Sequence, residues 1–303
     1  MVDASADLLL TTSGAAPRAV PSRWRSVLSR GGARLWVGGA LVSLLLIVAL
    51  LAPQIAPHDP LEQDLLSAQL PPSFTRGGDA AYPLGTDSLG RCVLSRLMFS
   101  ARTAVLVALI AASLAAVIGI AFGLIAGAFG GWIDQLVSRM IDVWMAFPPV
   151  LLSIVLAAVI GAGLTSVIAA IVVVDWTRFA RVVRAETTAQ LARDYVAAAR
   201  VLGLTRGEML RLEILPNLVP LIVTLLSVEM GIAILVEVIL SFVGISASGD
   251  MPSWGGMITE GRQLVYQAPW IMALPIVCVI ASVIGFNLLG DGLRAALDPV
   301  QRR

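Results

Sequence analysis

Six apolar segments separated by polar ones constrain the fold of this chain more than any other feature. They cover residues 35–52, 103–129, 136–160, 164–176, 218–243 and 269–289. About 20 consecutive apolar residues are enough for a helix to cross a bilayer. Hydrophobic residues form 58% of the chain and charged residues only 14%, against roughly 25% charged residues in soluble domains. The sequence therefore predicts an all-α, polytopic membrane protein with six transmembrane helices.

The polar regions divide the chain into further parts. Residues 1–34 are rich in Ala, Ser, Pro and Arg without sustained periodicity, so they predict a mobile tail. Residues 35–52 follow a basic region, as in a cleaved signal peptide, but the length of the apolar core favours a retained first transmembrane helix. Residues 53–102 are rich in proline and predict an irregular external loop. Residues 103–291 then form a five-helix core, and residues 292–303 a second tail.

The distribution of arginine sets the expected orientation. The sequence has no lysine, so all 21 basic residues are arginine. With both termini inside, 16 of these fall on the cytoplasmic side, and the positive-inside rule favours that topology. Arg91, Arg96 and Arg102 lie on the external side, and we expect them to mark an amphipathic helix on the outer surface. Arg178, just past the fourth apolar segment, is expected to snorkel to the interface.

A polar island from Arg178 to Asn217 interrupts the apolar core and contains seven arginines. A short helix is expected from Asp194 to Leu202, ended by Gly203, and a capping box opens a second one at Thr205. Pro216 is expected to end the second helix. Because nine residues are too few for a stable isolated helix, the first must lie against a surface. We interpret the island as a cytoplasmic docking element through which another protein drives this one.

Four acidic residues fall within or at the edges of apolar segments: Asp142, Asp175, Glu229 and Glu237. A central acid costs roughly 2.5 to 3.5 kcal/mol on the insertion scale, so these side chains must face protein or water. Glu229 and Glu237 lie two turns apart on nearly the same helix face. Two interpretations stay open: they line a polar path, or they pair structurally with an arginine or a helix end of a partner subunit.

Small residues recur every fourth position in the second segment and form one helix stripe. They are Ala111, Ala115, Gly119, Gly123, Gly127 and Gly131. Such a stripe lets two helices approach closely. Packing within the chain is favoured over a subunit interface. Gly161 and Gly163 are expected to form a tight external turn.

Several function classes are excluded by residues that the sequence lacks. A phosphate-binding P-loop needs a lysine, so the chain is not an ATPase. The single histidine, His58, cannot make a zinc site alone, and Cys92 and Cys278 are too far apart in the predicted topology to form a disulfide. The net charge of +1 argues against nucleic-acid binding. An ion-coupled secondary carrier or a membrane scaffold stays an alternative, although no inverted repeat is visible.

The motifs, taken together, resemble one protein family. They are YPLGTDSLGRCVLSRL, AFGGWIDQLVSRMIDVWMAFP, DYVAAARVLG with ILPN, LSFVGI, PSWGGMITEGR and FNLLGDGLRAALDP. In this order they resemble the second permease subunit of the dipeptide, oligopeptide and nickel ABC importers, over almost all of residues 82–299. The resemblance implies a type I importer fold and four partners: a homologous permease subunit, two ATPase subunits that bind ATP and Mg²⁺, and an extracytoplasmic substrate-binding protein.

The resemblance also assigns residues. The island is similar to the EAA loop, whose coupling helix sits in a cleft of an ATPase. The positions that match its pattern are Asp194, Tyr195, Ala198, Ala199, Arg200, Gly203 and Pro216. Ala197 stands where the family often has Glu, and Cys92 where it has Asp. The segment from Asp250 through Trp254 to Arg262 is expected to face the binding protein.

The resemblance predicts a permease subunit in the inner membrane of a bacterium, forming half of a translocation path. Asp142, Glu229 and Glu237 are the candidate residues of that path or of a subunit interface. The chain itself is expected to hold no cofactor and no metal. Di- or oligopeptides are the expected substrates, and nickel or glutathione the alternatives within the family.

Overall fold

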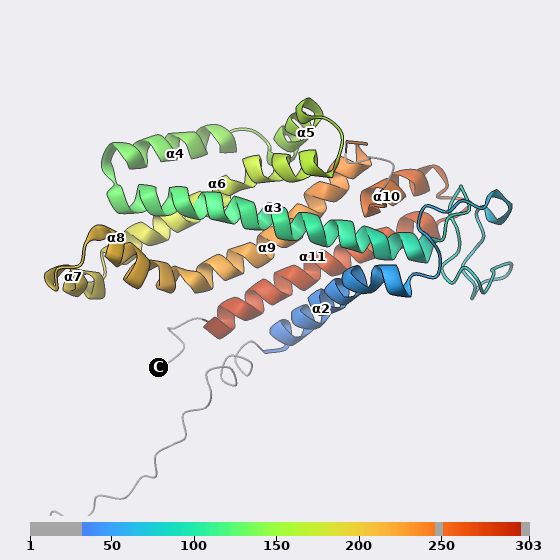
Figure 1. Ribbon diagram of the computed structural model, residues 1–303, viewed down its shortest axis with the longest axis horizontal. Coiled ribbons are helices and arrows are strands. Elements are labelled where there is room, and N and C mark those ends of the chain that lie inside the picture. Colours follow the sequence, from blue (N-terminus) through green and yellow to red (C-terminus); the bar gives the residue numbers. More distant parts are fainter. Residues whose placement is uncertain (1–31, 246–250, 298–303) are drawn as a thin grey trace, which may run out of the picture.

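The computed structural model describes residues 32–245 and 251–297, and in these ranges every regular element is a helix (Figure 1). Most of the expected tail 1–34, Asp250 and residues 298–303 lie outside the described residues. The elements are α2 (Gly32–Ile55), η1 (Leu65–Ser67), α3 (Val93–Phe129), α4 (Gly131–Met145), α5 (Pro149–Ile160), α6 (Leu164–Leu191), α7 (Asp194–Val201), α8 (Arg206–Glu208), the π-helix η2 (Met209–Ile214), α9 (Leu215–Phe242), α10 (Trp254–Gln263) and α11 (Trp270–Leu297).

The long helices lie along one axis, with the two kinds of polar segment at opposite ends (Figure 1). Helices α7 and α8 occupy one end, and α10 with the proline-rich loop occupies the other. Helix α2 packs on α11: the backbone of Leu35 lies against Gly292, and Gly38 faces the backbone of Leu289. The start of α2 and the end of α11 therefore lie together.

Four helical segments are long and apolar enough to cross a membrane: α2, α3, the run from Arg206 to Phe242, and α11. The pair α4 and α5 counts as a fifth if it is taken as one span, although the two helices are bent by 87°. The predicted segment 136–160 is therefore not one straight helix. Consecutive prolines explain the break, because Pro149 disfavours a helical conformation at Pro148, whose ψ is 120°.

Helix α3 corrects the predicted boundary of the external loop. It begins at Val93 rather than at residue 103, so Arg96 and Arg102 belong to it and not to a separate surface helix. Its 37 residues span about 55 Å at 1.5 Å per residue, well beyond the roughly 30 Å of a bilayer core. Its first turns must therefore project out of the membrane, where charged residues are tolerated.

The ends of α6 and α11 differ from the predictions in the same direction. Helix α6 continues to Leu191, so the first third of the island is an extension of this helix. Helix α11 continues to Leu297, so residues 292–297 are helical and not a tail. The helix predicted at Asp194 exists and ends at Val201. Apolar periodicity underestimates helix length where a helix passes from lipid into water.

The glycine stripe of α3 packs against α6, as expected for contacts within the chain. A Cβ on Gly119 would collide with the Trp176 carbonyl and Phe179, and one on Gly123 would lie 2.8 Å from the Ala180 carbonyl. Gly131 has open space and does not take part. Backbone contact at this distance requires glycine.

Substitution of Gly119 by alanine tests this packing. The added Cβ meets backbone that cannot move aside, so G119A should lower the free energy of unfolding by about 1–3 kcal/mol. The matched control is G39A on α2, where nothing lies within 4 Å of the new Cβ and the better helix propensity stabilises by up to about 1 kcal/mol. Thermal unfolding in detergent measures both, and equal melting temperatures would contradict the packing argument.

Candidate functional site

Helix α7 presents two opposite faces. Val196 and Ala199 are buried in a cluster with Met209, Ile214 and Leu218. The opposite face carries the exposed residues Asp194, Ala197, Ala198 and Val201, which follow the i, i+3, i+4, i+7 spacing of one helix stripe. The short helix thus lies on a surface of its own chain, as its length required, and leaves a second face free.

The turn after α7 exposes two large apolar side chains. Val201 is 88% and Leu202 81% exposed, and Gly203 follows with a φ of 86°, the left-handed conformation that suits glycine. The sequence analysis did not single out Val201 and Leu202. Projecting residues 194–202 onto a helical wheel would have found Val201, since Val196 and Ala199 occupy the opposite face.

The chain then re-enters the membrane through a continuous helical segment. The Thr205 capping box is present: its Oγ1 accepts from the Glu208 backbone N–H at 3.3 Å, and Glu208 Oε2 accepts from the Thr205 N–H at 2.8 Å. The sequence predicts that Pro216 ends a helix, and this is wrong. Pro216 lies in the first turn of α9. Proline is tolerated there because the N–H it lacks has no obligatory partner.

The predicted coupling residues separate into two groups. The exposed residues are Asp194, Ala198, Arg200, Gly203 and Pro216. Ala199 is buried, and the Tyr195 hydroxyl donates to Gln190 Oε1 at 2.8 Å. The buried group attaches α7 to the body of the protein, so only the exposed group has surface available for a partner.

Three arginines on α6, spaced three residues apart, each pair with acidic side chains. Arg178 Nη1 lies 3.5 Å from Glu229 Oε2 on α9, and Arg178 Nη2 lies 3.8 Å from Asp175 Oδ1. The side chains of Glu229 and Asp175 are each only 4% exposed. Arg178 therefore does not simply snorkel to the interface but neutralises charge inside the bundle.

The next two arginines bind α4. Arg181 Nη2 lies 3.3 Å from Asp142 Oδ1, and both side chains are about half exposed. Arg184 makes a two-pronged contact with Asp134, with Nη2 donating to Oδ2 at 2.8 Å and Nε to the other oxygen. This fork geometry is the strong form of an arginine–carboxylate pair. Helix α6 is thereby tied to α4 and to α9.

Glu237 has a different environment from Glu229. It is fully buried, and its Oε1 accepts a hydrogen bond from Ser241 Oγ at 2.6 Å, one turn along the same helix. Glu229 instead pairs with Arg178. For Glu229 the arginine expected on a partner subunit is thus found in the same chain.

Four charged residues connect the external loop to α10. Asp87 Oδ2 contacts Arg96 Nη1 and lies 2.7 Å from Arg91 Nε. Glu260 Oε2 lies 2.8 Å from Arg91 Nη2 and 2.6 Å from Arg96 Nη1. Asp87 and Arg96 are buried. We call these four residues the external charge cluster, and it holds the start of α3, the loop and α10 together.

The residues expected to face a binding protein have different positions. Trp254 is only 2% exposed, and its indole N–H donates to the Leu97 carbonyl at 3.3 Å, so it anchors α10 and offers no surface. Arg262 is exposed and lies over the Phe242 ring, 5.4 Å from its centroid. Asp250 lies outside the described residues.

Residues with metal or redox chemistry are not gathered into a site in the described part of the chain. Cys92 and Cys278 are free thiols, consistent with the prediction that they form no disulfide. The described residues contain no group of three or more His, Cys, Asp or Glu able to hold a metal ion. His58 stacks on Tyr82 with ring centroids 4.7 Å apart.

Two protein families match the chain. Residues 119–303 match the binding-protein-dependent transport system inner membrane component, and residues 34–72 match the N-terminal TM domain of oligopeptide transport permease C.

Relatives cover most of the chain. The dipeptide transport system permease protein DppC of Haemophilus influenzae is 40% identical over 86% of this chain and 90% of its own length. The di/tripeptide transport system permease protein DppC of Pseudomonas aeruginosa is 36% identical over 93% of both chains. The glutathione transport system permease protein GsiD of Pectobacterium atrosepticum is 35% identical over 86% of this chain and 85% of its own length.

Removal of one carboxylate tests the external charge cluster. D87A leaves the buried Arg96 with Glu260 as its remaining acidic partner, so the cost should stay below the roughly 3–5 kcal/mol of a buried charge left without any partner. We expect a lower melting temperature and faster proteolysis within residues 53–102. The control E62A removes an exposed acid of the same loop and should change neither. Unchanged proteolysis in D87A would show that the cluster does not hold the loop.

Proposed function

The chain belongs to the family of binding-protein-dependent inner membrane transport components, as a C-type permease subunit of the peptide ABC importers, and on this premise we propose its partners, topology and substrate. It forms half of an ATP-driven translocation path for di- or tripeptides, and a homologous permease subunit forms the other half. Two ATPase subunits bind ATP and Mg²⁺ in the cytoplasm, and an external binding protein delivers the peptide. We assign no ATP hydrolysis to this chain, because it has no lysine for a P-loop.

The free face of α7 is the observation that carries this proposal. A helix of eight residues is held by one face while the other, with Val201 and Leu202, exposes apolar surface at the end of the molecule opposite α10 (Figure 1). Exposed large apolar side chains beside a polar helix face favour a protein partner. We assign this face to the cleft of an ATPase subunit and regard Asp194, Ala198, Val201 and Leu202 as its contact residues.

We propose six membrane crossings. In addition to the segments that are apolar enough to span by themselves, α6 is one of them. Its charge opposes insertion, but Arg178, Arg181 and Arg184 each have an acidic partner within the chain, which lowers the cost. The pair α4 and α5 then serves as one broken span. Arg34 Nη1 lies 4.0 Å from Asp291 Oδ2, which supports both termini on the side of α7. That side is the cytoplasm, and the membrane is the bacterial inner membrane.

Helix α6 provides a mechanical route from the ATPase to the path. It ends at Leu191, and only two residues separate it from the start of α7 at Asp194. A displacement of α7 therefore acts directly on α6. The ion pairs to Asp134 and Asp142 transmit this movement to α4, and the pair with Glu229 transmits it to α9. ATP binding can drive such a switch between inward-open and outward-open states only because its partners bind the two states differently.

The predicted path residues take different roles in this proposal. Asp142 is exposed, so we assign it to the path or to the interface with the homologous subunit. Glu229 and Glu237 are buried and bonded within the chain, so we assign them structural roles. At the external end, we assign the exposed Arg262 to the face that receives the binding protein and, from its place in the sequence alone, Asp250 as well.

Peptides are the proposed substrates because relatives that are 40% and 36% identical to this chain are named dipeptide or di/tripeptide permeases. The relative named for glutathione makes glutathione the alternative. Nickel transport and ion-coupled carriage have no observation that favours them. A secondary carrier has no ATPase partner, so it would also not account for the exposed apolar side chains on the free face of α7.

The complete transporter, reconstituted in proteoliposomes with its binding protein, tests the function. We expect labelled dipeptide to accumulate only with ATP, and unlabelled dipeptide to compete better than glutathione. Accumulation driven by an ion gradient without ATP would identify a secondary carrier. Stronger competition by glutathione than by dipeptides would assign the chain to the alternative substrate.

Introduction of a charge at Val201 tests the docking face. Burying an unpaired carboxylate in an apolar cleft costs several kcal/mol, so V201D should reduce ATPase co-purification and peptide uptake by at least tenfold. Because Val201 is exposed in this chain, membrane insertion and thermal stability should not change. The control L212S alters an exposed leucine on η2 and should retain the ATPase. Full co-purification of the ATPase with V201D would exclude this face as the contact.

Crosslinking provides a second measurement of the same contact. A cysteine at Ala198, which is exposed where Ala199 is buried, should crosslink to the ATPase with a yield that changes on addition of ATP. Labelling of this cysteine by an impermeant external reagent, with no crosslink, would instead reverse the proposed topology.

A further inference from the structure

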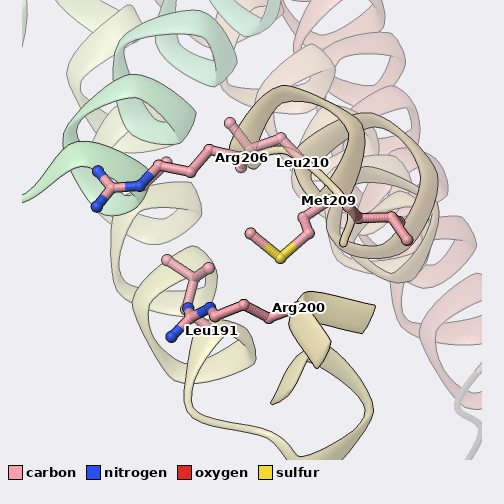
Figure 2. Close-up of a pocket in the computed structure, with 7 residues that line it drawn as sticks. Leu191, Arg200, Arg206, Met209 and Leu210 are labelled. Carbon is pink, nitrogen blue, oxygen red and sulfur yellow. The ribbon is translucent and has the colours of Figure 1, made fainter. Parts of the chain in front are cut away.

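A cavity of about 350 Å³ lies between the segment from Arg200 to Leu210 and the cytoplasmic ends of α3 and α6. Its wall includes Ala128 of α3 and Leu191 of α6, and its apolar lining continues with Met209 and Leu210 of η2. Arg200 of α7, Arg206 of α8 and Leu204 between them complete it. Figure 2 shows the two arginine side chains reaching toward the same side of the cavity, with Met209 between the segments that carry them.

The cavity carries an excess of positive charge. Its lining, as far as the structure describes it, includes no acidic residue. The ion pairs of the island's described arginines involve Arg178, Arg181 and Arg184, and not the two arginines of the cavity. The carboxyl end of a helix contributes only about half a negative charge, which is screened within a turn. Two guanidinium groups therefore favour an anion, and their planar N–H donors suit phosphate oxygens.

Aromatic residues beside the cavity indicate its depth in the membrane. Phe129 directly follows Ala128, and Trp132 lies on the first turn of α4 and is 73% exposed. Exposed tryptophan at a span end prefers the headgroup region of the bilayer. The cavity thus opens at the level of the cytoplasmic headgroups, where phosphates of anionic lipids are abundant.

The cavity does not belong to the docking face of α7. Arg200 follows Val196 by one turn and flanks the buried face, whereas Ala198 and Val201 point the opposite way. A protein bound to the outer face would leave the cavity open toward the membrane. This separation favours a lipid over a carboxylate of the ATPase as the occupant.

We propose that this cavity binds the phosphodiester headgroup of an anionic phospholipid. Arg200 and Arg206 contact the phosphate, and Leu191, Met209 and Leu210 pack against the glycerol and the first acyl carbons. The lipid bridges α7 and α8 to the ends of α3 and α6. Transport should therefore depend on anionic lipid in the cytoplasmic leaflet, in addition to any effect of that lipid on the ATPase.

Native mass spectrometry of the complete transporter, exchanged from detergent into defined lipid, tests the proposal. Phosphatidylglycerol should remain bound, while phosphatidylcholine should not. Each arginine contributes about 1 kcal/mol to attraction of anionic lipid, so R200Q/R206Q should weaken phosphatidylglycerol binding by about thirtyfold. The matched control R193Q/R211Q removes the same charge from the same island but not from the cavity lining, and should retain the lipid.

Three outcomes would overturn the proposal. Equal loss of lipid in both double variants would show attraction to the island's general charge and no site. Displacement of the lipid by millimolar inorganic phosphate would identify a soluble phosphate as the ligand. Absence of bound phosphatidylglycerol, together with a crosslink from position 206 to an ATPase subunit, would identify a partner carboxylate in the cavity.

Discussion

Charge compensation between α6 and the helices around it is the constraint on which this structure depends. An acid or a base that faces lipid costs several kcal/mol, yet α6 carries charges of both signs through the bundle. Each of its three arginines is paired, with Glu229 on α9 or with Asp142 and Asp134 on α4. The same contacts that make the helix tolerable in a membrane also tie three helices together. Helix α6 is thereby held by directional bonds and not by apolar packing alone.

The two ends of the molecule use different physical means to hold short segments. At the end that carries α7, this helix is held by apolar contacts of Val196 and Ala199, which leave its other face exposed. At the external end, α10 is fixed by the buried pair of Asp87 and Arg96 with Glu260. The glycine contacts of α3 with α6 connect the ends rigidly, because backbone lies against backbone there.

Several sequence predictions were confirmed because they rest on local chemistry. The helix at Asp194, the turn at Gly203 and the Thr205 capping box depend on a few adjacent residues. The boundary errors have a common cause: hydropathy reports where a helix contacts lipid, whereas a helix ends where its backbone hydrogen bonding ends. Helices α3, α6 and α11 therefore all extend past the predicted segments, and Pro216 lies in the first turn of α9 because an N-terminal turn needs no donor there.

The sequence by itself determined that this chain lies in a membrane, that it lacks the lysine of a P-loop and that a polar island interrupts its apolar segments. Those conclusions need only composition, the absence of lysine and motif order. Which residues of the island face outward required the tertiary structure, since burial of Ala199 and exposure of Val201 depend on where η2 and α9 lie. The partner of Glu229 was equally undetermined, because residues 51 positions apart in the chain meet only when α6 packs beside α9.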